Sequence, residues 1–488
     1  MLQKYISFAG LCLGFFIVMM DTTTVPFLYT TLMKVFDISL AMVAWVNNIY
    51  LITYAAFLLL GGRLGDFANR KIVVLSAYVA LGVGAAISGA GQTFWDLIIG
   101  RALMGVGSGL LTPQSMAYIS IIFTKGGRGT ALGIWGTVAG IATATGAVVT
   151  QIFLVTADWR WVMWCNIPIA LACFLIAAWG LPNTPGRGIS IKDVLVSSVY
   201  GLSLAAVIVG IYLISESETT MWVGKGVFAI GIVATAFLIR GELWRKRGHI
   251  LSPELWLDAT FLRVCLISGL LGMALTAFYL PLAFLLDARM NFGPLAISAI
   301  MVTISLSVSL VGPFAGNISD RVQPEKIVRL GLMLFAIANA LVGLIDMFFS
   351  GGTLAFVSLC AVMVIGGTGI GLAFPPLANL ALGRAQLATV GRAAAFYNSV
   401  RQVLSALGGV IVAIIFDSVV HMQLGRGFEV TAESLRESSS VTAIASFACF
   451  LFIALSLMVA AYMSRSSEEQ MSSNLVERRA GENERLGS

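Results

Sequence analysis

Three charged residues lie inside long apolar runs of this sequence: Asp21, Arg101 and Arg401. A charge at the centre of a membrane-spanning helix costs about 2.5–3.5 kcal/mol on insertion scales, so a charge retained there points to a functional role. Asp21 lies about 15 residues into the first run and Arg101 about six residues into the fourth, which runs the opposite way. With a rise of about 1.5 Å per residue, both side chains fall at a similar depth. They could pair, or face one cavity.

An acid and a guanidinium at this depth suit proton exchange. Desolvation favours the neutral carboxylic acid, whereas a nearby arginine favours the carboxylate. Moving Arg101 or admitting water would therefore change whether Asp21 holds a proton. A static buried ion pair is the structural alternative; we favour proton coupling because Asp21 lies so deep.

Arg401 belongs to a polar strip, YNSVRQ, within the thirteenth apolar run. Such a strip should face the protein interior and not lipid. Asn398, Arg401 and Gln402 could bind an anionic or polar group, or they could lock the helix to its neighbours. Aromatic residues could line a cavity nearby and stack against a flat or cationic solute, although packing between helices is the alternative for each: Trp45, Tyr50, Tyr54, Trp135, Phe278, Tyr279, Phe396 and Tyr397.

The elements that must position these residues are membrane-spanning helices. The 488 residues are 58% hydrophobic and only 11% charged, whereas a soluble domain carries about 25% charged residues. This excludes a soluble enzyme and a nucleic-acid binder. The six cysteines stand alone and the two histidines lie in polar breaks, so we expect neither a metal site nor a bound cofactor. The fold class is an all-α polytopic membrane protein with spans near residues 6–31, 42–61, 72–92, 95–118, 130–152, 161–181, 193–214, 222–240, 261–286, 294–316, 327–346, 353–377, 393–417 and 441–463.

The positive charges predict the orientation of these fourteen spans. Most of the 30 Lys and Arg residues fall in breaks on the side that holds both termini. The positive-inside rule places that side in the cytoplasm. The polar residues 464–488 are typical of a disordered tail on the same side.

An internal repeat divides the chain into two halves. GGRLGD ends at Asp66 and AGNISD ends at Asp320, while GVGSGLLTP begins at Gly105 and GTGIGLAFP begins at Gly367. Two matches in the same order at similar offsets predict two six-helix halves, an arrangement typical of transporters. The predicted units are an N-terminal half (1–181), a linker with two extra spans (182–260), a C-terminal half (261–463) and the tail (464–488).

The segment GGRLGDFANRK joins the second and third spans on the predicted cytoplasmic side. Gly62 permits close packing, and Asp66 could cap or pair with a neighbouring helix end. Asn69 tolerates a left-handed turn. Arg70 and Lys71 mark the membrane surface.

Several segments together resemble the major facilitator superfamily. GGRLGDFANRK resembles its loop motif G-x-L-a-D-x-x-G-R-K, with Asn69 in place of the second glycine. The first-helix segment MDTTTV is similar to the L-D-x-T-x-V motif of fourteen-span drug:proton antiporters. RALMGVGSG resembles the fourth-helix motif R-x-x-Q-G-x-G-x-A, with Met104 where Gln is usual. WRWVMWCNIPI resembles the start of the sixth span, and the two extra spans also fit this branch.

The resemblance implies roles for individual residues. It implies that Asp21 and Arg101 couple transport to protons, and that the cytoplasmic gate is formed by Gly62, Asp66, Arg70, Lys71, Asp320 and Arg321. The antiporter-like fifth helix would carry Gly136, Gly140 and Gly146. There the family motif continues with a proline and two glycines, whereas this chain has Ala147, Thr150 and Gln151, so we expect less bending and looser packing.

The leading functional hypothesis is proton-coupled export of amphipathic organic compounds or drugs, cationic ones among them, by alternating access. The expected partners are a small-molecule substrate, protons and the lipid bilayer, and we expect a monomer in the plasma membrane that uses the proton gradient and no cofactor. The alternative is a dedicated transporter of one endogenous metabolite, lipid or peptide. A non-transporting membrane sensor or a lipid-modifying enzyme is less favoured, because the sequence shows neither a soluble output domain nor a cluster of acid/base or nucleophilic residues.

Overall fold

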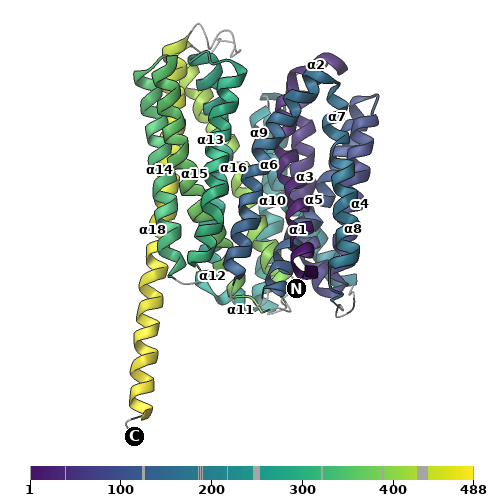
Figure 1. The fold of residues 1–488 in the computed structure, drawn as a ribbon, viewed down its shortest axis with the longest axis vertical. Coiled ribbons are helices and arrows are strands. Elements are labelled where there is room, and N and C mark those ends of the chain that lie inside the picture. The colour runs from purple at the N-terminus through teal and green to yellow at the C-terminus, as the bar shows by residue number, and fades with distance from the viewer. Residues whose placement is uncertain are drawn as a thin grey trace.

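The chain folds into a bundle of long helices in the computed structural model (Figure 1). The structure describes residues 2–38, 40–123, 127–184, 186, 188, 191–216, 218–245, 253–319, 322–386, 389–425 and 438–486. Within these ranges, fourteen helices are long and apolar enough to cross a membrane, and no strand is present. This confirms the predicted fold class.

Six of these spans form the N-terminal bundle. Their helices are α1 (Leu2–Thr24), α3 (Leu40–Phe67), α4 (Arg70–Ala90), α5 (Phe94–Ile122), α6 (Arg128–Thr156), and α7 (Trp159–Trp164) with α8 (Asn166–Gly180), which together make the sixth span. The first span ends earlier than the apolar run predicts: α1 stops at Thr24, and a 3-10 turn η1 (Val25–Leu28) and a short helix α2 (Tyr29–Phe36) follow. The proline in η1 lacks an amide donor and ends the α-helical ladder.

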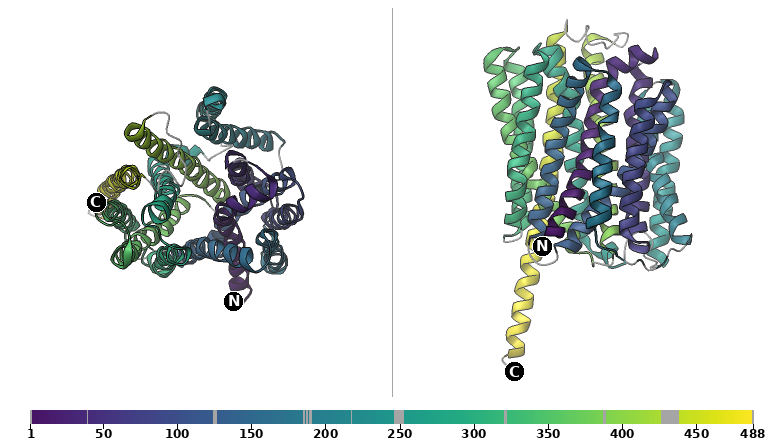
Figure 2. Two further views of the ribbon diagram at one scale, coloured as in Figure 1. Left: turned by 90° about the horizontal axis from the view of Figure 1, so that it is seen from above. Right: turned by 45° about the vertical axis from the view of Figure 1, so that its right-hand side comes forward.

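The C-terminal bundle repeats this arrangement. It contains α12 (Ala259–Phe284), α13 (Pro294–Ser319), α14 (Pro324–Phe348), α15 (Gly352–Gly383), α16 (Val390–Leu424) and α18 (Ser439–Leu486), with α11 (Pro253–Leu257) before it and the π-helical turn η2 (Leu285–Arg289) after α12. Figure 2 shows the two bundles side by side when the molecule is seen from above. The most extensive contacts between the two bundles are those of α6 with α13 and of α3 with α16.

The two extra helices, α9 (Ile191–Glu216) and α10 (Glu218–Arg245), lie outside this pair of bundles. α9 packs on α3 of one bundle and on α16 of the other, whereas α10 packs chiefly on α9. Trp222 and Phe237 of α10 are 72% and 75% exposed. Such apolar exposure is what a helix surrounded by lipid requires.

Local capping explains how some of the helices begin. Thr93 and Asp96 form a capping box at the start of α5: the Asp96 amide donates to Thr93 Oγ1 (3.2 Å), and the Thr93 amide donates to Asp96 Oδ2 (2.9 Å). Asn69 does not adopt the left-handed turn that the sequence favours. Its φ is −73°, and its side chain caps α4 by accepting a hydrogen bond from the Lys71 amide (3.0 Å).

The helix α18 continues beyond the bundle to Leu486 and projects from it alone (Figure 1). A polar helix without tertiary packing gains little stability in water. The expected disorder of residues 464–488 therefore stays a prediction.

Candidate functional site

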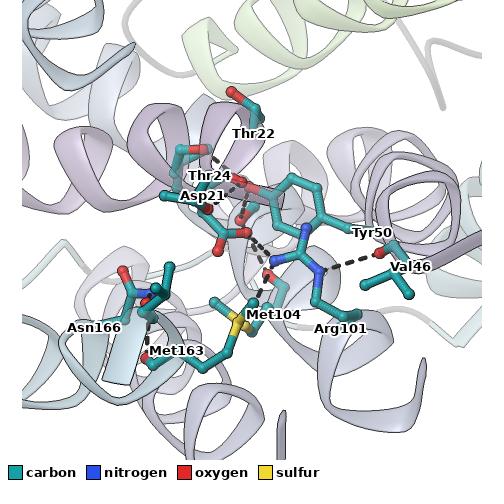
Figure 3. A network of polar contacts seen from close by, with 12 residues as sticks. Asp21, Thr22, Thr24, Val46, Tyr50, Arg101, Met104, Met163 and Asn166 are labelled. Atoms are coloured by element: carbon teal, nitrogen blue, oxygen red, sulfur yellow. Dashed lines mark hydrogen bonds and ion pairs between the residues drawn. The ribbon is translucent and has the colours of Figure 1, made fainter. Parts of the chain in front are cut away.

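Asp21 and Arg101 form an ion pair at the centre of the N-terminal bundle (Figure 3). Asp21 comes from the C-terminal half of α1 and Arg101 from the first turns of α5, so the two antiparallel helices bring the side chains to one depth. Arg101 Nη1 donates to Asp21 Oδ2, and both residues are fully buried. Of the two arrangements that the sequence leaves open, the structure has the direct pair.

The guanidinium of Arg101 also contacts the neighbouring helix α3. Its Nε donates to the Val46 carbonyl (3.1 Å), and its central carbon lies 4.5 Å from the ring centroid of Tyr50. The Tyr50 hydroxyl donates to the Val18 carbonyl of α1 (3.1 Å) and lies 2.8 Å from Ser108 Oγ of α5. One charged cluster therefore connects α1, α3 and α5. Tyr50 belongs to this cluster, although the sequence analysis grouped it with the cavity residues.

The pair is not fully satisfied by hydrogen bonds. Asp21 Oδ1 and Arg101 Nη2 are buried and have no hydrogen-bond partner among the described residues. Besides Asp21 and the Val46 carbonyl, Arg101 contacts one weak acceptor: its Nη1 lies 3.9 Å from the sulfur of Met104, the residue that replaces the usual Gln. A buried charge with unpaired polar atoms is poorly stabilised. The ion pair is therefore less stable than it would be in a complete hydrogen-bond network.

A second charged cluster joins the two bundles at the end that holds the α3–α4 loop, which we call the motif end. Asp66, near the end of α3, pairs with Arg70, the first residue of α4. Asp66 Oδ2 also accepts the Arg392 amide of α16 (3.2 Å) and lies 3.4 Å from Arg392 Nε. Because α16 belongs to the C-terminal bundle, this carboxylate ties the two bundles together.

Close helix packing accompanies this contact. A Cβ atom on Gly62 would lie 2.4 Å from Ala395 Cβ and 2.5 Å from the Gly391 carbonyl oxygen, so only glycine permits α3 to approach α16 here. Gln114 of α5 accepts from Arg70 Nη1 (3.0 Å) and donates to the Gly61 carbonyl (2.6 Å). We call Asp66, Arg70 and Arg392 the lock; with Gln114 it joins the four helices α3, α4, α5 and α16.

In the part of the chain that the structure describes, the other charged residues expected at the gate are not seen to take part in these ion pairs. Lys71 is half-buried beside the lock, and its contact there is the backbone bond to Asn69. Asp320 and Arg321 lie outside the described residues. A further link between the bundles at the motif end joins α6 to α15: Arg128 Nε donates to Asn379 Oδ1 (2.9 Å).

An aromatic stack crosses between the two bundles. Phe15 of α1 stacks on Trp135 of α6 with 3.7 Å between ring centroids, and Trp135 lies parallel to Phe374 of α15 at 6.4 Å. The guanidinium carbon of Arg401, on α16, lies 5.0 Å from the centroid of Phe374. We call these four residues the central stack. Phe15 and Trp135 are buried, whereas Phe374 and Arg401 keep accessible surface.

The remaining cavity candidates are divided between the surroundings of the stack and other packing. Tyr54 and Tyr397 are buried and interact electrostatically with Arg401. Asn398 donates to Met116 Sδ (3.0 Å) across the bundle interface. Trp45 packs in a cluster of α3, α9 and α16 residues. The other two are Gln402, which is half-buried, and Tyr279, which is 45% exposed and packs edge-on against Phe278.

The glycines of α6 let it approach the other bundle. A Cβ atom on Gly136 would lie 3.2 Å from the Phe374 ring, and one on Gly140 would lie 3.2 Å from the Ser305 carbonyl oxygen. Gly146 is buried and accepts a hydrogen bond from Thr150 Oγ1 (2.8 Å). The first half of α6 is therefore tightly packed despite the altered motif farther along the helix.

The sequence analysis did not single out Phe374, Phe15, Gln114 or Gly391. For Phe374 a signal existed, because it precedes the proline of the repeated motif GTGIGLAFP, whose first copy has Thr112 at that place. Gly391 and Gln114 carry no comparable signal. Their roles depend on which helix faces they meet.

A sequence model of the Major Facilitator Superfamily matches residues 11–409. The chain belongs to this superfamily. Among its relatives are the puromycin resistance protein of Streptomyces alboniger, 26% identical over 80% of this chain and 78% of that protein, and a multidrug transporter protein of Bacillus subtilis, 24% identical over 82% and 73%. The crystal structure of the human organic anion transporter MFSD10 is similar with a TM-score of 0.63 and 14% identity, over 94% of this chain and 98% of that one.

Membership in the Major Facilitator Superfamily identifies the chain as a multi-pass membrane transporter and not an enzyme. The structural likeness shows that the fold is that of this superfamily.

Proposed function

We propose that this transporter exports amphipathic organic compounds in exchange for protons by alternating access. The observation that carries the proposal is the buried Asp21–Arg101 pair, whose partners leave one carboxylate oxygen and one guanidinium nitrogen unpaired among the described residues. The names of the puromycin resistance and multidrug relatives support export of drug-like compounds.

Protonation of Asp21 would change the contacts among three helices. A neutral Asp21 no longer attracts Arg101 as a full charge, so α1 loses its strongest tie to α5. Arg101 keeps its bonds to α3 through Val46 and Tyr50. Phe15 lies six residues, about 9 Å, before Asp21 on the same helix, so a shift of α1 would reach the central stack.

Alternating access requires one end to close while the other opens. In this structure the lock of Asp66, Arg70 and Arg392 and the Arg128–Asn379 bond join the bundles at the motif end. Release of the lock would be needed before a substrate could leave or enter there. A proton and a substrate that each favour a different facing state would then be exchanged by population shift.

The proposal also includes the orientation of the chain in the membrane, the membrane in which it lies and its oligomeric state. The excess of Lys and Arg on the side of both termini favours the motif end as the cytoplasmic face of the plasma membrane. The chain would then work as a monomer, with the proton gradient as its energy source.

The Asp21→Asn variant tests the coupling. Purified protein in liposomes should lose transport driven by a pH gradient but keep gradient-independent exchange of labelled substrate, because the binding site is left intact. Asp158→Asn is a matched control: Asp158 is a half-exposed carboxylate that caps α7, and an asparagine can cap equally well.

The Asp21→Asn variant leaves Arg101 buried without a counter-charge, which could prevent folding. The double variant Asp21→Asn/Arg101→Met removes that unpaired charge, so it tests the coupling even if the single variant misfolds. Proton-driven transport at the wild-type rate in either variant would remove Asp21 from the mechanism. A drug panel that finds no exported compound would instead favour a dedicated transporter of one metabolite.

A further inference from the structure

Arg401 differs from the other arginines of the membrane interior in its electrostatic surroundings. The buried carboxylates Asp21, Asp66 and Asp346 each lie against an arginine already: Asp21 against Arg101, Asp66 against Arg70, and Asp346 with its Oδ1 3.5 Å from Arg289 Nε. In the described part of the chain, no carboxylate forms an ion pair with Arg401. Its neighbours are aromatic and neutral.

The position of Arg401 is central in the molecule. Arg401 lies nine residues beyond Arg392 along α16, about 14 Å deeper than the lock at the motif end. Its stem packs on α12, where a Cβ atom on Gly272 would lie 2.7 Å from Arg401 Cγ. Its guanidinium lies over the ring of Phe374 on α15, and its charge interacts with Tyr54 on α3. The side chain thus sits between the two bundles, and part of its surface remains accessible.

From this geometry we infer that the central site selects planar organic anions, with Arg401 binding the anionic group and the accessible ring of Phe374 receiving the ring system. The inference deepens the proposed function and rests on it, since it names the substrate class of that transporter. It narrows the amphipathic compounds of the sequence analysis, which included cationic ones, to anions.

Charge complementarity decides between an anion and a cation here. A guanidinium presents five N–H donors in a planar fork that matches a carboxylate or a phosphate. A cation that bound to the Phe374 ring would share it with the guanidinium of Arg401, whose central carbon lies 5.0 Å from the ring centroid, and like charges in a medium of low dielectric repel. Asp21, Asp66 and Asp346 are each paired with another arginine. An anionic group would supply Arg401 with the counter-charge that the described residues do not provide.

The stack supplies a second requirement, a flat apolar body. Trp135 and Phe374 are nearly parallel, with 12° between their planes. A planar solute that stacked on the accessible Phe374 ring would continue this arrangement, and aromatic pairs prefer such offset stacking. The ligand class is therefore an aromatic ring system with one carboxylate or a similar anionic group.

Three fluorescent probes of nearly equal size test the inference: 1-pyrenebutanoate, its neutral primary amide and 1-pyrenebutylamine. Binding to the full chain in detergent is followed by pyrene fluorescence, and uptake is measured in liposomes under a pH gradient. We expect the wild type to bind the carboxylate at least about tenfold more tightly than the amide, as a charge-assisted hydrogen bond predicts, and to bind the ammonium probe most weakly.

The substitution Arg401→Gln should remove the preference for the carboxylate and leave amide binding unchanged, while Arg401→Lys should keep part of it. Arg160→Gln is the matched control, because Arg160 is a partly exposed arginine paired with Asp158 outside the bundle interface. A melting curve for each variant checks that the protein is folded.

The outcomes separate this inference from the proposed function. If the wild type binds the amide or the ammonium probe as tightly as the carboxylate, or binds none of the three, the inference is wrong. It is also wrong if folded Arg401→Gln keeps the preference. If the carboxylate binds through Arg401 but a pH gradient drives no uptake, the anion site stands and proton-coupled export falls.

Discussion

Gly62 offers the sharpest test of how the two bundles are held together at the motif end. In the substitution Gly62→Ala, the new Cβ would lie 2.4 Å from Ala395 Cβ and 2.5 Å from the Gly391 carbonyl oxygen. Ordinary contacts of a Cβ begin at 3.4 Å. Because protein interiors are close-packed, α3 and α16 must separate by about 1 Å at this point.

This clash destabilises only the conformation in which the motif end is closed. Overpacking by a single methyl group costs about 1–3 kcal/mol, and the clash disappears once α16 moves away from α3. A change of 1.4 kcal/mol is tenfold in an equilibrium, so the ratio of the closed to the open motif end should fall by about fivefold to 150-fold.

Pulsed electron–electron resonance can measure this change. Spin labels on Lys71→Cys and Lys326→Cys, at the starts of α4 and α14 in opposite bundles, report the separation at the motif end. The six native cysteines are first replaced. Gly62→Ala should move the distance distribution toward longer values.

Gly82→Ala is the matched control, because its Cβ would meet only Ala170 Cβ at an ordinary 3.6 Å within the N-terminal bundle. It should leave the distribution unchanged. An unaltered distribution in folded Gly62→Ala would refute the argument that this contact limits opening.

Two further predictions concern the charged clusters. Arg392→Gln should shift the same spin-label distances in the same direction as Gly62→Ala but by less, because Asp66 keeps its bond to Arg70; an unshifted distribution would show that the ion pair between the bundles adds nothing to closure. Met104→Gln should raise the melting temperature by a few degrees, since an amide oxygen gives Arg101 an acceptor worth about 1 kcal/mol, and a lowered melting temperature would contradict this.

The sequence predicts the helices well and their facing residues less well. The fourteen apolar runs correspond to fourteen helices in the described part of the chain, because a span in lipid must satisfy its own backbone. The depth of Asp21 and Arg101 follows from counting residues along antiparallel helices. Each of these predictions depends only on the position of a residue along its helix axis.

The rotation of a helix is harder to predict when every face is apolar. Tyr50 and Tyr54 lie one turn apart on α3, yet Tyr50 contacts the Asp21–Arg101 pair, whereas Tyr54 interacts with Arg401. Nothing in the surrounding residues distinguishes the two tyrosines. Likewise, the contact of Asp66 with Arg392 joins residues 326 positions apart, and its formation depends on how two whole bundles meet.

The position of α9 has a consequence for the route that solutes take. Its contacts with both α3 and α16 cover one of the two lateral seams between the bundles, and α10 adds a second layer outside it. The opposite seam is filled by α6 and α13, whose glycines bring their backbones into contact at Gly133 and Gly312. A solute dissolved among the lipid tails therefore meets a wall at either seam. Partition into the bilayer should therefore not by itself set the rate at which a compound is carried.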